Sequence, residues 1–345
     1  MRDPLMRIAR GICVLVVLVL TASAANAQAA TARVVRAATA FLSTLDPQQR
    51  QRVQFAFDDA QQRARWSNFP TGFVRRAGVS LGELNGMQRS AALALVSSAL
   101  SRRGFEKVQD IMQGDEVLKA NERNNSLFGK DLYYVSILGT PSERTPWMLQ
   151  FGGHHLALNI TIAGDRGVLT PTLTGAQPAL YTVAGKTVRP LGPESDKGLA
   201  LLNALDESQR ARAVLNYRVA DLVLGPGQDG KTIQPEGLPA SAMNARQRAL
   251  LLEVVAEWTG IVHESEAAVR MAEVRAGLDS TYFAWSGPTT AAPGRNIAAY
   301  YRVQGPKLVI EYAPQRMGGD PSMHVHTIYR DPTNDYGRAL TATAK

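Results

Sequence analysis

Apolar positions follow two different spacings along the chain, and each spacing predicts one kind of element. Between residues 245 and 276 the apolar side chains recur at helical spacing, with Gly260 as a candidate break, at Leu251, Leu252, Val255, Trp258 and Val262. Elsewhere they form short β-branched and aromatic runs bounded by Gly, Pro and Asp, namely "YYVSIL", "LALNITI", "FAW", "YYRVQ", "KLVIEY" and "HVHTIYR". Such runs are typical of antiparallel strands. The fold class predicted is therefore α+β.

The helical patterns occur in two similar pairs. "LDPQQRQRVQFAF" from Leu45 resembles "LDESQRARAVLNY" from Leu205, and "LNGMQRSAALALV" from Leu84 resembles "MNARQRALLLEVV" from Met243. Strand-like segments follow both pairs, which favours an internal duplication over chance similarity between amphipathic helices. We expect two related helix-then-antiparallel-strand repeats, residues 28–195 and 196–345, packed together as one compact unit.

The N-terminal residues have the pattern of an export signal. Arginines at positions 2, 7 and 10 precede the apolar run "GICVLVVLVLTASA", which ends in the small residues "AANAQA". The alternative, a retained membrane anchor, needs roughly 18 or more unbroken apolar residues. We expect residues 1–27 to be a signal peptide, cleaved after Ala27, and the mature protein to be periplasmic or secreted, without a stable membrane anchor.

Cysteine content and charge narrow the possible chemistry. The only cysteine, Cys13, lies inside the expected signal, so the mature chain has no disulfide, thiol nucleophile or thiolate ligand. The formal net charge of +8 favours anionic partners by long-range steering. The basic residues are scattered beside Asp and Glu, without a basic and aromatic stretch, so we expect a small-molecule ligand or substrate and no nucleic acid.

Four of the five histidines lie in strand-like segments. His324 and His326 are two positions apart, so on a strand they project to the same face and can offer two imidazoles to one metal. His154 and His155 follow a glycine pair, and neighbours on a strand face opposite sides. Only one of them can therefore reach the same ion, unless the glycines form a bulge; the other would transfer protons or contact substrate. The sequence leaves open which of the two faces the site.

Glu311 is the carboxylate that best completes this group. It lies in the apolar strand segment "LVIEYAP", where an ionised and unpartnered carboxylate would be costly. We expect one divalent transition metal, Zn, Cu, Fe or Mn, held by His155, His324, His326 and Glu311, with catalytic roles for His154 and His155. The alternatives are a metal-free histidine-based site and a set of polar strand residues that merely hydrogen-bond to each other.

Three further residues are candidates for substrate binding. Arg330 could clamp an anionic ligand or form a structural pair with Asp331. Trp147 and Tyr301 could wall a pocket near the histidines, although aromatic strand residues more often belong to the core. The chain contains no HEXXH motif, which argues against the zincin class.

Several of these segments resemble a known family. "YYVSILGTPSERTPWMLQFGGHHLALNITI", "FAWSGP", "YYRVQGPKLVIEY" and "HVHTIYRDPTNDYG" are similar to landmarks of a mostly exported bacterial family catalogued as domain of unknown function 3500. The similarity runs from Leu45 to Gly337, and one departure is Tyr329, where the family pattern has Trp. It implies no activity. The positions it marks as important are His154, His155, Glu311, His324, His326, Arg330 and Asp331.

Two classes of function follow from these observations. The first is an exported metal-dependent enzyme, a hydrolase if the ion activates water or an oxidoreductase if it activates dioxygen. The second is a non-catalytic periplasmic protein that binds a metal or small ligand for delivery. An enzyme site keeps a coordination position open, whereas a binding site tends to be closed.

Overall fold

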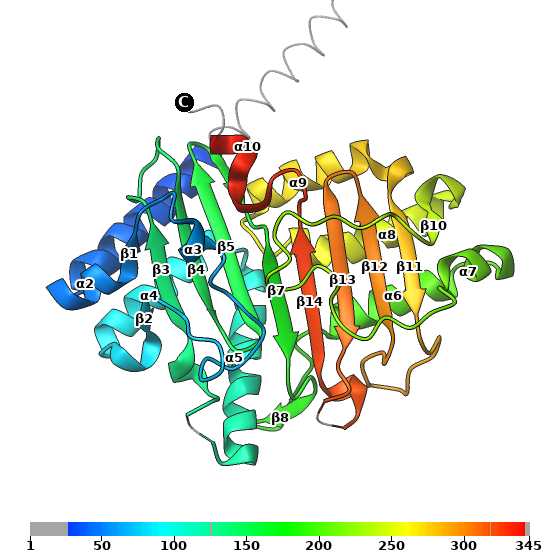
Figure 1. The fold of residues 1–345 in the computed structure, drawn as a ribbon, viewed down its shortest axis with the longest axis horizontal. Helices are drawn as coiled ribbons and strands as arrows, with labels where there is room; N and C mark the ends of the chain where they lie inside the picture. Colours follow the sequence, from blue (N-terminus) through cyan, green and yellow to red (C-terminus); the bar gives the residue numbers. More distant parts are fainter. Residues whose placement is uncertain (1–26, 125, 318, 342–345) are drawn as a thin grey trace, which may run out of the picture.

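The computed structural model describes residues 27–124, 126–317 and 319–341. It is a mixed α/β structure built around one large sheet, with helices behind the sheet and irregular segments in front of it (Figure 1). The expected combination of helices with antiparallel strands is present, and one short parallel pair, β1 with β3, adds to it. The expected signal peptide lies almost wholly outside the described residues. Within them, none of the helices is both long and apolar enough to cross a membrane.

Most helices begin at a residue whose side chain accepts a hydrogen bond from the first turn, which satisfies a backbone N–H that the helix leaves free. Asp46, Asn85, Ser101, Asp206 and Asn244 cap α2, α4, α5, α7 and α8 in this way. The helices are a first one over residues 27–44, then α2 Pro47–Val53, α3 Ala60–Arg63, α4 Gly86–Ala99, α5 Arg102–Glu122, α6 Gly192–Asn203, α7 Glu207–Ala213, α8 Ala245–Thr259, α9 Glu264–Ala276 and α10 Arg338–Thr341. The stretch 245–276 is thus two helices, because Gly260 ends α8.

The main sheet has its last strand in the chain near its centre. Its order is β1-β3-β4-β5-β7-β14-β13-β12-β11-β10, with β2 on β3 and β6 on β5. These strands are β1 Gln54–Phe55, β2 Val79–Ser80, β3 Tyr134–Leu138, β4 Trp147–Gly153, β5 Leu156–Ala163, β6 Arg166–Val168, β7 Thr172–Ala176, β10 Leu238–Pro239, β11 Tyr282–Ser286, β12 Tyr300–Gly305, β13 Leu308–Pro314 and β14 Val325–Arg330. A separate hairpin pairs β8 Tyr181–Val183 with β9 Lys186–Val188. Strands from both sides of the expected boundary at residue 196 therefore join in one sheet.

The two faces of the sheet are covered differently, and strand alternation decides which side chains each face receives. On the helix side, Trp258 of α8 donates to the Thr327 hydroxyl of β14 at 3.0 Å. On the other side, Ile328 packs with Trp66 and Leu222, which lie in the irregular segments 56–78 and 215–237. His326 and Ile328 are two apart on β14, so His326 also faces these segments. We call this side the segment face.

A buried charge cluster ties the helices together behind the sheet. Glu257 of α8 pairs with Lys197 of α6 and Arg103 of α5, each at 2.5 Å, and Lys107 of α5 pairs with Glu194 of α6. Burial acts to raise the pKa of Glu257, but the hydrogen bond from Lys197 and the nearby cationic charges outweigh it and lower that pKa. Glu257 is therefore ionised in the folded protein at neutral pH.

Candidate metal centre

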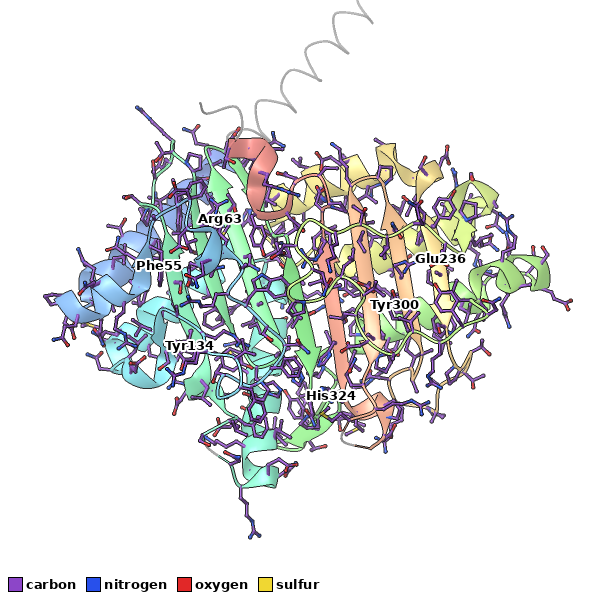
Figure 2. The ribbon with its side chains drawn as sticks, viewed as in Figure 1. Phe55, Arg63, Tyr134, Glu236, Tyr300 and His324 are labelled. Carbon is purple, nitrogen blue, oxygen red and sulfur yellow. The ribbon has the colours of Figure 1, made fainter. Side chains whose placement is uncertain are left out.

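Three buried histidines converge at the lower end of the sheet as drawn, where Figure 2 labels His324. Ligand nitrogens of His155, His324 and His326 all lie within 4.8 Å of one another. The Nε2 atom of His324 is 2.9 Å from Nε2 of His155 and 3.1 Å from Nε2 of His326. This group could hold a metal ion.

His154 and His155 form the two-residue turn that joins β4 to β5. The last strand pair before the turn is Gly153 with Leu156, so the glycines belong to a regular ladder and not to a bulge. The strand alternation assumed for the two histidines is therefore wrong, because both lie in the turn and their rings stack with centroids 3.7 Å apart. His155 has φ of 59°, in the left-handed region that costs about 1–2 kcal/mol for a residue with a Cβ.

Gly175 of β7 leaves the space that the His155 ring occupies. A Cβ on Gly175 would lie 2.9 Å from the Val325 carbonyl oxygen and 3.0 Å from Cδ2 of His155. The backbone N–H of Gly175 also donates to the His155 carbonyl at 2.7 Å, which fixes the turn against β7. Nothing in the segment "TLTGA" marked this glycine as part of a site.

His324 and His326 lie together on the segment face, as their two-residue spacing predicts. His324 precedes β14 in extended conformation, and its Nδ1 lies 2.9 Å from the Met317 carbonyl oxygen. His326 lies in β14, with Nδ1 3.3 Å from a carboxylate oxygen of Asp221. The Asn68 amide nitrogen is 3.3 Å and 3.4 Å from the two ring nitrogens of His326 and so packs along the ring.

These outer contacts bear on where the imidazole protons lie. A carbonyl or carboxylate oxygen can only accept, so the contacts to Met317 and Asp221 favour a proton on Nδ1 in both His324 and His326. In a neutral imidazole with its proton on Nδ1, the Nε2 atom carries a lone pair. The Nε2 lone pairs of His324 and His326 then face each other across 3.1 Å. They repel unless a cation lies between them. Burial and the neighbouring His326 lower the pKa of His324 to about 4, so the His324 ring is neutral at neutral pH.

His155 is also held in its neutral form. Burial, followed by the repulsion that a protonated neighbouring histidine would exert, holds the pKa of His155 well below its usual range. Neutral imidazoles are the form that binds metal ions. His155 and His324 are therefore in the neutral form that a metal ion requires.

His154 belongs to a different pair. Its Nδ1 lies 2.6 Å from Oδ1 of Asp115 on α5, and the other carboxylate oxygen of Asp115 accepts from the Gly129 backbone at 2.9 Å. Tyr133 donates its hydroxyl to the His154 carbonyl at 2.9 Å, and the Phe128 ring lies 5.2 Å from the His154 ring. No pattern in the sequence marked Asp115, which lies on a helix 39 positions before His154.

Glu311 is not part of the group, which corrects its expected place as a ligand. Its carboxylate accepts from the backbone N–H groups of Val223 and Leu224, both at 2.8 Å, and from the Tyr300 hydroxyl at 2.6 Å. The inference from the sequence that a buried carboxylate needs partners is correct. These partners are two backbone amides of segment 215–237 and the Tyr300 hydroxyl, and not a metal ion shared with the histidines. Because that segment also carries Asp221, Glu311 helps to hold the carboxylate that contacts His326.

The three expected substrate residues have other partners. Arg330 is buried and uses four of its five N–H groups, on the carbonyls of Leu224 and Gly225 and the carboxylates of Asp229 and Asp335. Asp331, its expected partner, pairs instead with Arg270 at 2.7 Å.

The two aromatic residues are on the wrong face to line the histidines. Tyr301 pairs with Tyr312 and Tyr312 with Thr327, so Tyr301 faces the helices, where its hydroxyl donates to the Glu194 carbonyl. Trp147 is fully buried in the main core, and its Nε1 donates to the Ser142 carbonyl.

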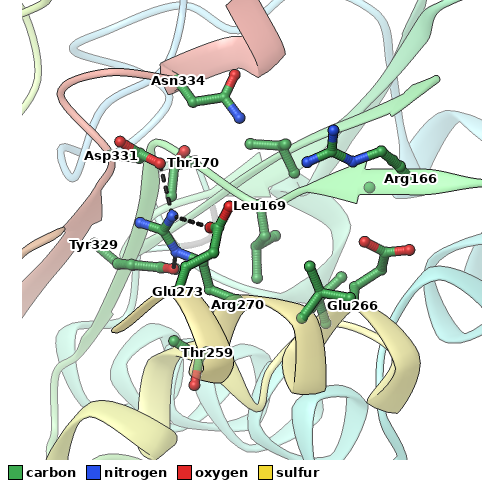
Figure 3. A pocket seen from close by; sticks show the side chains of 14 residues that line it. Arg166, Leu169, Thr170, Thr259, Glu266, Arg270, Glu273, Tyr329, Asp331 and Asn334 are labelled. Carbon is green, nitrogen blue, oxygen red and sulfur yellow. Dashed lines mark hydrogen bonds and ion pairs between the residues drawn. The ribbon is translucent and has the colours of Figure 1, made fainter. Parts of the chain in front are cut away.

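A pocket without histidines lies at the opposite end of the β7–β14 pair (Figure 3). Arg270 projects into it from α9 and contacts the Tyr329 hydroxyl and the carboxylates of Asp331 and Glu273. Its main polar groups are thus paired with one another. The histidine group and this pocket occupy the two ends of one strand pair.

Fold and site together define a mixed α/β protein with a buried histidine triad able to hold a metal. The chain belongs to the family described as "Protein of unknown function (DUF3500)", whose model matches residues 27–338. The resemblance noted in the sequence is thereby confirmed over nearly the whole chain. No curated protein matches the chain, and no solved structure does.

Proposed function

We propose that this protein is a metal-dependent enzyme in which His155, His324 and His326 hold one divalent transition metal through their Nε2 atoms. The observation that carries the proposal is the convergence of three buried histidines, with the Nε2 atoms of His324 and His326 facing each other at 3.1 Å while each Nδ1 contacts an acceptor, the Met317 carbonyl or the Asp221 carboxylate. Metal-bound histidines commonly donate their other ring N–H to a carbonyl or carboxylate in this way.

The spacing of the donors supports the same reading. Nitrogens that surround a tetrahedral Zn²⁺ at about 2.0–2.1 Å lie about 3.3 Å apart. The Nε2 separations of 2.9 and 3.1 Å need only small movements to reach that value. The left-handed backbone of His155 is a local strain of the kind found at functional sites.

Three histidines leave a fourth position for an outside molecule, which is the pattern of catalytic rather than structural zinc sites. An ion held there can polarise a water molecule or a carbonyl oxygen. His154 lies against His155, and Asp115 fixes its proton on Nδ1, so its Nε2 is free to accept a proton from water or substrate. Asp115 orients His154 and stabilises its charged form. These roles favour hydrolysis over oxidation.

The first experiment is elemental analysis of protein purified without an affinity tag or chelator. About one ion per chain is expected in the wild type and in His263→Ala, a control that removes a histidine at the start of α9. The double variant His324→Ala/His326→Ala should contain none. Absence of metal from the wild type after incubation with Zn, Cu, Fe and Mn would overturn the proposal.

A second experiment separates an enzyme from a non-catalytic binding protein. In the Co²⁺-substituted protein an open position should take up added azide, with a change in the visible spectrum. An unchanged spectrum at saturating azide would indicate a closed site and favour metal storage or delivery.

We also propose that the fold arose by duplication. Support comes from the strand order, in which β3-β4-β5-β7 and β11-β12-β13-β14 read the same from either edge of the sheet. Equivalent glutamines also bond alike, Gln88 to Gln49 at 2.8 Å and Gln247 to Gln209 at 2.7 Å. Superposition of the two halves in an experimental structure tests this, and a different path of either half would count against it.

Export remains our proposal for residues 1–27. The support is the basic, apolar and small-residue order of that segment. Mass spectrometry of the protein from its host should find a chain that begins at Gln28 in the periplasm or medium. An intact N-terminus in the cytoplasm would refute it.

A further inference from the structure

Four segments that contact the histidines also carry an apolar side chain that is at least partly exposed. Phe69 follows Asn68 and is 51% exposed, and Met317, whose carbonyl accepts from His324, is 78% exposed. Val223 is two residues beyond Asp221 and is 38% exposed.

The fourth segment makes the contact directly. The ring of Phe128 lies 5.2 Å from the ring of His154 and is partly exposed. The same stretch of chain meets the one that bears Phe69, because a Cβ on Gly72 would lie 2.5 Å from the Leu127 side chain. These two segments are therefore adjacent to each other, and we call Phe69, Phe128, Val223 and Met317 the apolar rim.

Exposed apolar residues scattered singly over a surface need no explanation. These four side chains come from segments far apart in the sequence. Each lies within two residues of an atom that contacts one of the clustered histidines. Ligand sites combine a small number of placed polar groups with mainly apolar walls, and the apolar rim is a set of partly or largely exposed apolar side chains on segments that contact the histidines.

We propose that the metal centre binds a molecule with a metal-binding polar group and an extended apolar part, such as an acyl chain or aryl group, which packs on the apolar rim. This inference rests on the proposed metal site and names the class of its substrate. The polar group occupies the open coordination position, and the apolar part lies over Phe69, Phe128, Val223 and Met317.

The test compares two hydroxamic acids that share a metal-binding group and differ in chain length. Isothermal titration of the Zn-loaded wild type should show octanohydroxamic acid binding at least tenfold more tightly than acetohydroxamic acid. A tenfold gain corresponds to the burial of about two methylene groups. Phe69→Ser should reduce the ratio to below threefold, and Met317→Gln, at a more exposed position, should also reduce it without a risk to folding.

The matched control is Val269→Ser on α9, which is exposed to the same 51% as Phe69 and lies away from the histidines. It should leave the ratio unchanged. Equal binding of both acids by the metal-loaded wild type would overturn the substrate class and leave the metal site standing. If the wild type binds no metal, the metal site and the substrate class fall together.

Discussion

Replacement of His155 should separate metal binding from stability, because the same residue is a ligand and a point of backbone strain. The comparison that isolates the strain is His155→Gly against His155→Ala, since both remove the imidazole. At φ of 59° the alanine keeps the left-handed penalty of about 1–2 kcal/mol, and the glycine does not.

The expected difference follows from two opposing contributions. Glycine loses about 0.5–1 kcal/mol relative to alanine through the greater freedom of the unfolded chain. The glycine variant avoids the left-handed penalty of about 1–2 kcal/mol but loses this smaller amount. His155→Gly should therefore be more stable than His155→Ala by roughly 0.5–1 kcal/mol. At an ordinary strand position the order is reversed, and Ala157→Gly in β5 should destabilise the protein.

The assay is equilibrium urea unfolding of the metal-free variants, with metal content measured in parallel. Both His155 variants should bind metal far more weakly than the wild type. A glycine variant less stable than the alanine variant would refute the argument from strain. Full metal content in either variant would remove His155 from the ligand set.

Three other predictions concern residues that support the site or the core. Gly175→Ala should push the His155 ring from its place and lower metal affinity at least tenfold in a chelator competition, and unchanged affinity would show that the ring has room to move. Glu311→Gln should cost about 2 kcal/mol in urea unfolding, because one backbone N–H then faces an amide N–H, and metal affinity should fall as Asp221 loses its position. Because the pKa of Glu257 is lowered on folding, its stabilisation is present above the unfolded value of about 4.3 and is lost as the pH falls through the folded value. Glu257→Gln should therefore cost about 3 kcal/mol at pH 7 and progressively less in melts towards pH 3, and a constant difference would contradict this.

The sequence was informative where local rules apply. Helical spacing located α8 and α9, short β-branched runs located β3, β5 and β11 to β14, and the spacing of His324 and His326 placed both side chains on one face of the sheet. Local rules failed at His154 and His155, because a tight turn of this kind normally has Gly or Asn at its left-handed position. The prediction therefore treated His154 and His155 as strand residues on opposite faces, although they form the turn at which the strand ends.

The supporting residues could not be predicted because their contacts are long-range. Asp221 lies 105 positions from His326, in a segment with no periodic pattern. Glu311 was recognisable as a carboxylate that needs partners, but backbone amides give no side-chain signature in the sequence. Packing against segments distant in the sequence thus determines which residues support the histidines. The sequence itself shows only the two histidine motifs.

The central position of β14 has a consequence for the newly made chain. This strand is the last in the sequence, yet it lies between β7 and β13 and joins the two parts of the sheet. Until it emerges from the ribosome, both neighbours are open edges that can pair with other chains. The donors on His155 and His324 are 169 positions apart, so an ion cannot be bound before that strand is in place. Truncation within β14 should therefore cause aggregation as well as loss of metal, since one late step closes the sheet and creates the site.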